Sequence, residues 1–396
     1  MNLAPFSISR LPRIEFGAGV LAKLPALAAS FGQRVLLVTG GRFLQQSRHW
    51  EKLLQGLQQQ GLSWEILQVS AEPSPQLVDE AVQQYKGANI AVVIGIGGGS
   101  VLDSAKAIAG LLQPGNSVMD HLEGVGPELS YQGPATPYIA VPTTAGTGAE
   151  ATKNAVLSLH GDTGYKKSFR DEKLVPQYAV VDPDLLETCP PELIAANGMD
   201  ALTQLLESYV SKRANALTDA LAISGITAVR DSLLVLFQGE GDQAQARSQM
   251  AYAAMLSGIT LAQVGLGSVH GLAAPLGAFF PIPHGMVCGI LVAEATRMNI
   301  DCMEAREAEN PALLKYAQIG RLFRQRTHLE EVGARVFLVH TLNQWTKQLQ
   351  LPRLLAYGVT EAGLDHVVAN ARGSSMQTNP IVLSDAELKT ILQKCL

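Results

Sequence analysis

Apolar residues follow two different periods along the first half of the chain, from Ile14 to about Pro190. Short runs rich in β-branched residues predict strands, whereas segments with an apolar residue at every third or fourth position predict helices. The two kinds of segment alternate, which predicts a mostly parallel sheet with helices on both faces. The predicted strands are Val35–Thr39, Trp64–Gln68, Ala91–Ile94, Tyr138–Val141 and Tyr178–Val181, and the predicted helices include Gly19–Ala29, Trp50–Gly61 and Gln76–Tyr85.

The pattern changes near Cys189, after which helical periodicity continues to the end of the chain with almost no strand candidates. The predicted helices there include Met199–Val210, Ala216–Phe237, Gln243–Ala262, Val269–Ala278 and Phe337–Gln350. We therefore expect an α/β domain with a parallel sheet over residues 1–188 and an all-α domain over residues 189–396. One Pro-Pro pair at the junction is too short to act as a flexible linker.

Composition narrows the class of protein. With 47% hydrophobic and 16% charged residues over 396 positions, the chain has the composition of a compact globular protein. Its net charge of −5 argues against a nucleic-acid partner, and no run of Lys or Arg marks a membrane-surface patch. The four cysteines lack the spacing of a disulfide framework or a Cys-based zinc site. Without a signal-peptide pattern or an uninterrupted apolar stretch of about 20 residues, we expect a cytoplasmic protein with no membrane partner.

The most distinctive stretch runs from Ala91 to Gly110, where an apolar strand leads into a glycine-rich loop and then into a helical pattern. Glycine lets a backbone adopt positive φ and approach a ligand closely, and the first N–H groups of a helix attract an anion. We therefore predict that this loop binds phosphate, with a plain strand-to-helix turn as the alternative. Its glycines are Gly95, Gly97, Gly98 and Gly99, and Ser100 follows them.

A second loop bears on the choice of nucleotide. The predicted strand Val35–Thr39 is followed by Gly40, Gly41 and Arg42, at a place where NAD-binding proteins carry a carboxylate for the ribose hydroxyls. Two glycines and an arginine leave room and positive charge for a 2′-phosphate. We therefore predict NADP(H) in preference to NAD(H), with a surface turn and a solvated arginine as the alternative.

A third loop follows the predicted strand Tyr138–Val141 and contains Thr143, Thr144 and Thr147. Threonine hydroxyls in such a loop can bind diphosphate and ribose oxygens, although single Thr-rich turns are usually helix caps. Downstream, Lys166 is long enough to reach a phosphate.

Polar residues interrupt the apolar helical half at three places. Asp200 and Gln204 lie one helical turn apart and so share a face, His270 lies among small apolar residues, and His284 begins a predicted helix. One carboxylate and two imidazoles, with an optional amide oxygen, suit zinc or ferrous iron with a position open for substrate. The alternative is that the two histidines are core residues. Cys288 could add sulfur, but a buried structural thiol is the simpler interpretation.

These segments resemble the iron-containing (group III) alcohol dehydrogenases nearly end to end. The resemblance implies a dehydroquinate synthase-like fold, with a Rossmann-like dinucleotide domain, a helical domain and an active site in the cleft between them. It also implies NAD(P)-dependent interconversion of small alcohols with aldehydes or ketones, and a homodimer. The matching segments are Phe16–Gly19, Gly97–Ser100 with Asp103 and Lys106, Pro142–Thr147, Val181–Pro183, Gly198–Leu202 and the segments around His270 and His284.

The resemblance also assigns individual residues. By position, Asp200, His270 and His284 are implied to bind the metal and to act in catalysis through it. The Gly40-Gly41 pair is similar to that of NADP-preferring members. The implied cofactor contacts are Gly98, Gly99, Ser100, Asp103, Thr143, Thr144, Thr147 and Lys166.

Two positions depart from the family pattern. Gln204 stands where the family usually has a fourth ligand, a histidine, and Ala274 stands where a histidine often helps to relay the proton. An amide oxygen is a harder and weaker ligand than imidazole, so both iron and zinc stay open. Glycerol dehydrogenases, with one Asp and two His around zinc, make a three-ligand site credible. The alternatives are a metal-free reductase of an activated carbonyl, similar to maleylacetate reductases, and a catalytically silent nucleotide-binding homologue. Without an imidazole at Ala274, the proton would pass through water or the ribose hydroxyls.

Overall fold

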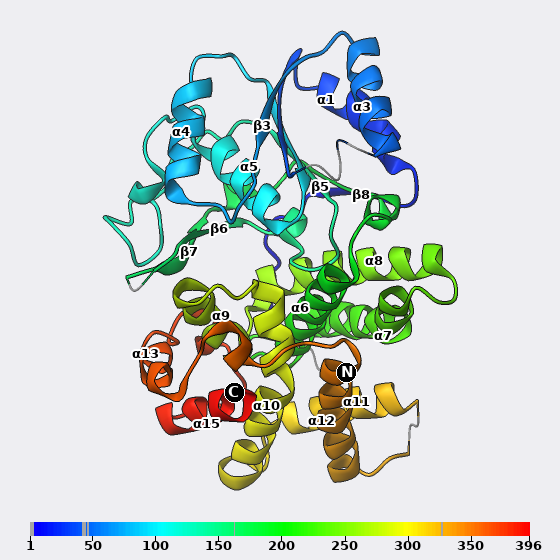
Figure 1. Ribbon diagram of the computed structural model, residues 1–396, viewed down its shortest axis with the longest axis vertical. Coiled ribbons are helices and arrows are strands. Elements are labelled where there is room, and N and C mark those ends of the chain that lie inside the picture. Colours follow the sequence, from blue (N-terminus) through cyan, green and yellow to red (C-terminus); the bar gives the residue numbers. More distant parts are fainter. Residues whose placement is uncertain (1–3, 42–44, 46, 162, 326–327) are drawn as a thin grey trace. The chain divides into compact units, whose positions relative to one another are not determined.

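A computed structural model describes residues 4–41, 45, 47–161, 163–325 and 328–396 of the protein (Figure 1). The chain forms two compact units. The N-terminal unit comprises Ile8–Leu159 and Gly164–Cys189, and the C-terminal unit comprises Pro190–Leu396 with two short earlier stretches. All strands of the described residues lie in the N-terminal unit.

The N-terminal unit is built on a six-stranded sheet in the order β1-β8-β5-β4-β2-β3, with every pairing parallel. The inner strands β2, β4 and β5 are buried along nearly their whole length, as expected for a parallel sheet covered on both faces. The strands are β1 (Arg13–Phe16), β2 (Arg34–Thr39), β3 (Ser63–Gln68), β4 (Val92–Gly97), β5 (Tyr138–Pro142) and β8 (Tyr178–Val181).

Alternate side chains of each strand enter two separate cores. Leu36 and Val38 of β2 pack into the core under α4 (Pro75–Tyr85) and α5 (Gly99–Leu111). Val35 and Leu37 of the same strand pack on the other face, with α1 (Leu24–Ala29) and α3 (Arg48–Gln59). The period of two along a strand therefore places helices on both faces of the sheet (Figure 1).

The predicted parallel sheet is confirmed, and each of the five predicted strands is present with its ends within three residues. Edge strand β1 was not predicted, and neither was the antiparallel hairpin of β6 (Asn154–Leu159) and β7 (Tyr165–Arg170). The sequence of β7, Tyr-Lys-Lys-Ser-Phe-Arg, has no apolar run, and only Phe169 is buried.

The secondary structure of the C-terminal unit is helical, with no strand among its described residues. Every residue of α6 from Gly198 to Val210 is buried, because α7, α8 and α10 pack around this helix. All five predicted helices are present, although α6 begins at Pro191, well before the predicted start. The helices of eight or more residues are α6 (Pro191–Val210), α7 (Ala216–Gln238), α8 (Gln243–Val264), α9 (Ser268–Phe279), α10 (His284–Arg306), α11 (Ala312–Arg324), α12 (Glu331–Gln348) and α15 (Asp385–Cys395).

One helix, α7, is long and apolar enough to cross a membrane by length and composition, and the bent pair α8–α9 meets the same test as a unit. Helices α7 and α8 pack on α6, and α9 packs on α10. Ile226, Val229 and Leu233 of α7 are fully buried, and Asp219 pairs with Lys315 of α11 at 2.8 Å. We therefore interpret α7 as a core helix of the C-terminal unit.

Candidate metal centre and cofactor loops

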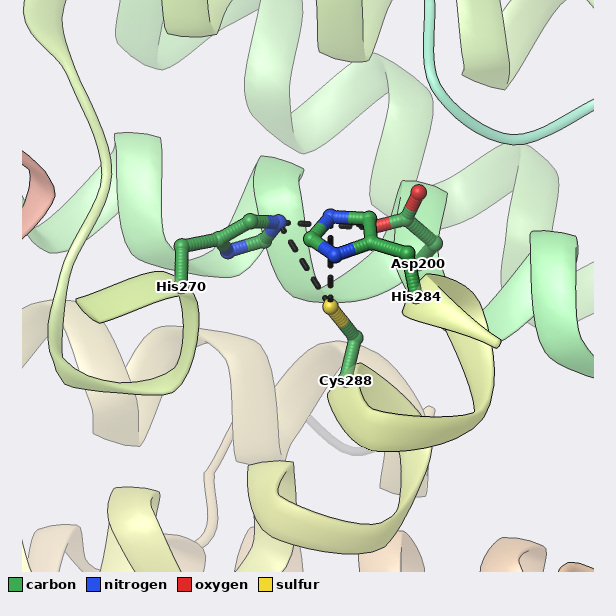
Figure 2. Close-up of side chains that lie close together, drawn as sticks. All are labelled: Asp200, His270, His284 and Cys288. Carbon is green, nitrogen blue, oxygen red and sulfur yellow. Dashed lines mark hydrogen bonds and ion pairs between the residues drawn. The ribbon is translucent and has the colours of Figure 1, made fainter. Parts of the chain in front are cut away.

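Four side chains of the C-terminal unit point toward one another in Figure 2: Asp200 from α6, His270 from α9, and His284 and Cys288 from α10. One donor atom from each lies within 4.8 Å of the other three. In the described part of the chain, this is the one group of three or more His, Cys, Asp or Glu side chains so arranged.

The distances are those of donors around a common centre. The Nε2 atoms of His270 and His284 lie 3.3 and 3.9 Å from Asp200 Oδ1, and Cys288 Sγ lies 3.6 and 3.9 Å from the same two nitrogens. Around a tetrahedral ion with bonds of about 2.0–2.3 Å, neighbouring donors lie about 3.3–3.6 Å apart. A small inward movement of these side chains would therefore complete a coordination shell.

The state of Asp200 favours a cation at this place. Its side chain is 1% exposed, and Oδ2 has no hydrogen-bond partner among the described residues. Burial by itself raises the pKa of Asp200, but the charge of His284 and the hydrogen bond from His270 outweigh it and hold the pKa at about 2. In the absence of a metal, the two histidines compensate this buried charge but leave Oδ2 without a hydrogen bond, and a bound cation would pair it. The donor set and this oxygen fit a divalent metal.

A second carboxylate orients His270. Glu207, 4% exposed, accepts a hydrogen bond from His270 Nδ1 at 2.7 Å through one oxygen and from the Val269 N–H at 2.7 Å through the other. With a metal bound, Nδ1–H would still donate to Glu207 and Nε2 would have lost its proton, so that its lone pair would face the ion, as in many carboxylate–histidine–metal arrangements. Sequence reasoning missed Glu207. The signal was present, since Asp200 and Glu207 lie seven residues apart and so share one face of α6.

The segment before His270 is fixed by a buried amide network. The Ser268 N–H donates to Asn379 Oδ1 at 3.0 Å, and Asn379 donates to Asn299 Oδ1 at 2.8 Å. A Cβ at Gly267 would lie 2.8 Å from oxygens of both Asn379 and Glu207. Only glycine fits there without moving the groups that hold the His270 segment in place.

Gln204, the remaining predicted ligand, and Cys288, expected to be a structural thiol, have different surroundings. Gln204 is buried, and its Oε1 accepts a hydrogen bond from the Ser257 hydroxyl at 2.7 Å, so its assignment as a metal ligand stays a prediction. Cys288 is fully buried, as a structural thiol would be, but its sulfur belongs to the cluster. In the absence of a metal, burial raises the pKa of Cys288 to about 12.

In the N-terminal unit, the glycine-rich loop joins β4 to α5 as predicted, but positive φ is not the reason for its glycines. None of Gly95, Gly97, Gly98 and Gly99 has positive φ, so that part of the prediction is wrong. Close packing is the reason. A Cβ at Gly97 would lie 2.5 Å from Val101, and one at Gly99 would lie 2.7 Å from Thr147.

The threonine loop thus packs directly on the start of α5. A Cβ at Gly98 would lie 3.3 Å from Thr144 Oγ1, and the Thr143 N–H donates to the Gly97 carbonyl at 3.0 Å. No side chain caps α5, whose first intrahelical bonds run from Val101 and Leu102 to the Gly98 carbonyl. The N–H groups of Gly99 and Ser100 have no intrahelical acceptors and are available to an anion.

The loops after β2 and β4 are neighbours, because these strands pair in register with Thr39 opposite Ile96. The chain runs from β2 outward to β3 and then returns to β4, which makes this the switch point of the sheet. A Cβ at Gly41 would meet nothing within 4 Å, whereas one at Gly40 would lie 3.4 Å from Val101. Arg42 lies outside the described residues.

Two charged residues predicted to contact the cofactor have protein partners. Asp103 accepts a hydrogen bond from the Val156 N–H at 3.1 Å, and burial raises its pKa. Lys166 pairs with Glu72 at 3.2 Å. Their assignment to the cofactor stays a prediction. Lys106, from the same sequence motif, is fully buried and ties α5 to the backbone carbonyls of Ala149 and Asn154.

Comparisons with known proteins identify the family of the chain. The family described as "Iron-containing alcohol dehydrogenase" matches residues 12–183, and "Fe-containing alcohol dehydrogenase family, C-terminal" matches residues 194–396. The chain is 31% identical to the NADPH-dependent butanol dehydrogenase of Clostridium saccharobutylicum, over 97% of this chain and 96% of that protein. It is 29% identical to the NAD-dependent methanol dehydrogenase of Bacillus methanolicus, over 97% and 98%. The crystal structure of a 1,3-propanediol oxidoreductase matches with a TM-score of 0.87 at 27% identity, covering 99% of this chain and all of that one.

Proposed function

The chain belongs to the iron-containing alcohol dehydrogenase family, and from this premise we propose which of its residues hold the metal and the nucleotide. It is an NAD(P)-dependent, metal-assisted oxidoreductase that interconverts a small alcohol with its aldehyde or ketone. The observation that carries the assignment is the convergence of Asp200, His270 and His284, with one oxygen of Asp200 buried and unpartnered.

Asp200, His270 and His284 are the proposed metal ligands and act in catalysis through the metal, iron or zinc. When bound, a divalent ion supplies a Lewis acid that favours the alkoxide over the alcohol and polarises the carbonyl in the reverse direction. Asp200 supplies negative charge from a buried position, and Glu207 keeps the Nε2 lone pair of His270 directed at the ion. Of the three proposed ligands, His284 has the most exposed side chain, at 26% against 6% for His270 and 1% for Asp200.

The nucleotide is proposed to bind at the switch point of the sheet. When bound, it supplies the nicotinamide that accepts or donates the hydride. The N–H groups at the start of α5 would hold the diphosphate, and the threonine loop packed on them would add hydroxyl groups. The proposed contacts are Gly40, Gly41, Arg42, Gly97, Gly98, Gly99, Ser100, Asp103, Thr143, Thr144, Thr147 and Lys166.

We favour NADP(H) over NAD(H) on the residues of this chain alone, since similar dehydrogenases are named for each nucleotide. No carboxylate directly follows β2 at Gly40 and Gly41, and the space around Gly41 is open. With alanine at position 274, water or the ribose hydroxyls would carry the proton.

The proposed setting is a cytoplasmic homodimer without nucleic-acid or membrane partners. The absence of a basic run and the net charge of −5 argue against a nucleic-acid partner. The packing of α7 among the core helices of its unit argues against a membrane partner.

Metal analysis and chelation followed by assay test the proposal. The purified protein should contain one divalent ion per chain and oxidise small alcohols with NADP⁺ faster than with NAD⁺. Chelation should abolish turnover, and added Zn²⁺ or Fe²⁺ should restore it. Unchanged activity after complete metal removal would favour the metal-free carbonyl reductase instead. Nucleotide binding without turnover of any alcohol or aldehyde would favour a catalytically silent homologue.

A further inference from the structure

The cluster contains a fourth donor that the proposed function does not use. Cys288 lies four residues after His284 in the first turns of α10, so both side chains project from the same face of that helix. Cys288 is fully buried, and its sulfur lies 3.6 and 3.9 Å from the two imidazole nitrogens that face the ion site.

Gln204, the other candidate for the fourth position, is engaged elsewhere. Its carbonyl oxygen accepts the Ser257 hydroxyl of α8 at 2.7 Å. The Ser257 hydroxyl is held in turn on the Ala254 carbonyl of its own helix at 2.8 Å. The Ser257 hydroxyl occupies one of the two lone pairs of this oxygen and fixes the orientation of the amide, whereas the Cys288 sulfur already lies 3.6 and 3.9 Å from the two imidazole nitrogens.

We propose that Cys288 is the fourth protein ligand of the metal, bound through its sulfur as a thiolate, and that Gln204 remains outside the coordination shell. On metal binding the thiol proton passes to solvent, and the S–metal bond replaces the S–H bond with no change of oxidation state. Asp200 and Cys288 together then balance the two positive charges of the ion. The inference rests on the proposed metal-assisted function.

A thiolate also sets the preference among metals. Sulfur is a soft ligand that favours zinc and cobalt over harder ions such as manganese, whereas a carboxamide oxygen does the reverse. The proposed Asp-His-His-Cys set therefore makes this a zinc-type site, where the substrate oxygen would be a fifth ligand, as zinc sites can become five-coordinate.

Cobalt substitution is the direct test, because Co²⁺ bound by a thiolate has a strong near-ultraviolet charge-transfer band that oxygen and nitrogen ligands do not give. The apo full-length protein is titrated with Co²⁺ alone, for wild type, Cys288→Ser, Gln204→Ala and Cys302→Ser. Cys302 is a matched control because it is a buried cysteine of the same helix, with its sulfur 3.2 Å from Glu387 rather than in the cluster. Thermal unfolding of each apo protein establishes that the variant is folded.

We expect the band in wild type, Gln204→Ala and Cys302→Ser, and its loss in Cys288→Ser. Cys288→Ser should also weaken the binding of Co²⁺ and Zn²⁺ by more than the ~10–100-fold expected when a hydrogen-bond partner of a metal ligand is lost. The binding of Mn²⁺ should weaken by much less. Stoichiometric Co²⁺ binding by wild type without the band would overturn the Cys288 assignment and leave the metal function standing. Failure of wild type to bind Co²⁺ at all would overturn both.

Discussion

Glu207 touches neither substrate nor metal, yet replacing it with glutamine should weaken the metal site. In the wild-type chain its carboxylate accepts from His270 Nδ1 at 2.7 Å and from the Val269 N–H at 2.7 Å, in a pocket where Glu207 is 4% exposed. Glu207→Gln keeps the volume but removes the charge. It also allows the amide NH₂ to face Nδ1, which would favour the tautomer with its proton on Nε2.

The expected loss of metal affinity in Glu207→Gln follows from these two hydrogen bonds. A hydrogen bond to a charged group contributes roughly 1.5–3 kcal/mol, against roughly 0.5–1.5 kcal/mol for a neutral one. The difference, about 1–2 kcal/mol, weakens metal binding by roughly 10-fold, since each 1.4 kcal/mol is a factor of ten. This agrees with the ~10–100-fold range found when a partner of a metal-bound histidine is lost.

Competition with a chromogenic chelator measures the metal dissociation constant, and kcat/KM is measured with saturating metal. Glu207→Gln should bind Zn²⁺ roughly 10-fold more weakly, and excess metal should restore much of its activity. Glu72→Gln is a control at a partly exposed carboxylate that pairs with Lys166 instead of a histidine. Wild-type metal affinity in folded Glu207→Gln would refute the claim that this carboxylate orients His270.

Three further changes test the nucleotide-binding unit. Gly41→Asp adds a carboxylate after β2, where a side chain would meet nothing within 4 Å. Because the carboxylate would repel a 2′-phosphate, kcat/KM with NADPH should fall by at least ~10-fold while kcat/KM with NADH is spared. An unchanged ratio of the two kcat/KM values would contradict the cofactor assignment. Gly99→Ala places a methyl group 2.7 Å from Thr147. It should destabilise the unit by about 1–3 kcal/mol in urea unfolding and weaken nucleotide binding. No change in either measurement would count against close packing as the reason for this glycine. Burial raises the pKa of Glu150 from 4.5 to about 7, so the folded state binds more protons than the unfolded state between these values and stability falls as pH rises through this window. Between pH 4.5 and 7, the wild-type free energy of unfolding should therefore fall by roughly 3 kcal/mol relative to that of Glu150→Gln, as measured by urea titrations. If the free energies of unfolding of the two proteins run parallel with pH, Glu150 is not a buried, protonated carboxyl.

The sequence predicted those parts of the fold that apolar runs mark. Inner strands such as β4 read as uninterrupted apolar residues because both faces of the sheet are covered. The hairpin could not be found in this way, because the residues of β7 are mostly half-exposed and Lys166 and Lys167 interrupt its apolar pattern. Burial in such a strand is set by what packs on it, which local sequence does not encode.

In the candidate site, too, some residues could be predicted from local sequence and others depend on how the helices pack. Asp200, His270 and His284 could be predicted because polar residues stand out in apolar helices, and the resemblance supported them. The role of Glu207 depends on α9 passing beside α6, and the place of Cys288 in the cluster depends on the packing of α10. Lys106 lies in a motif that resembles a cofactor-binding loop, but its ammonium group is buried and donates to backbone carbonyls instead, which the sequence did not indicate.

We expect one divalent ion, held by Asp200, His270 and His284, to carry the catalysis. Parallel metal analysis, NADPH binding by fluorescence and steady-state assay of wild type and Asp200→Asn test it most directly. Asp200→Asn should retain nucleotide affinity and a folded structure but lose stoichiometric metal and essentially all turnover of small alcohols. A folded Asp200→Asn protein that still holds one ion per chain and turns over at the wild-type rate would contradict the account.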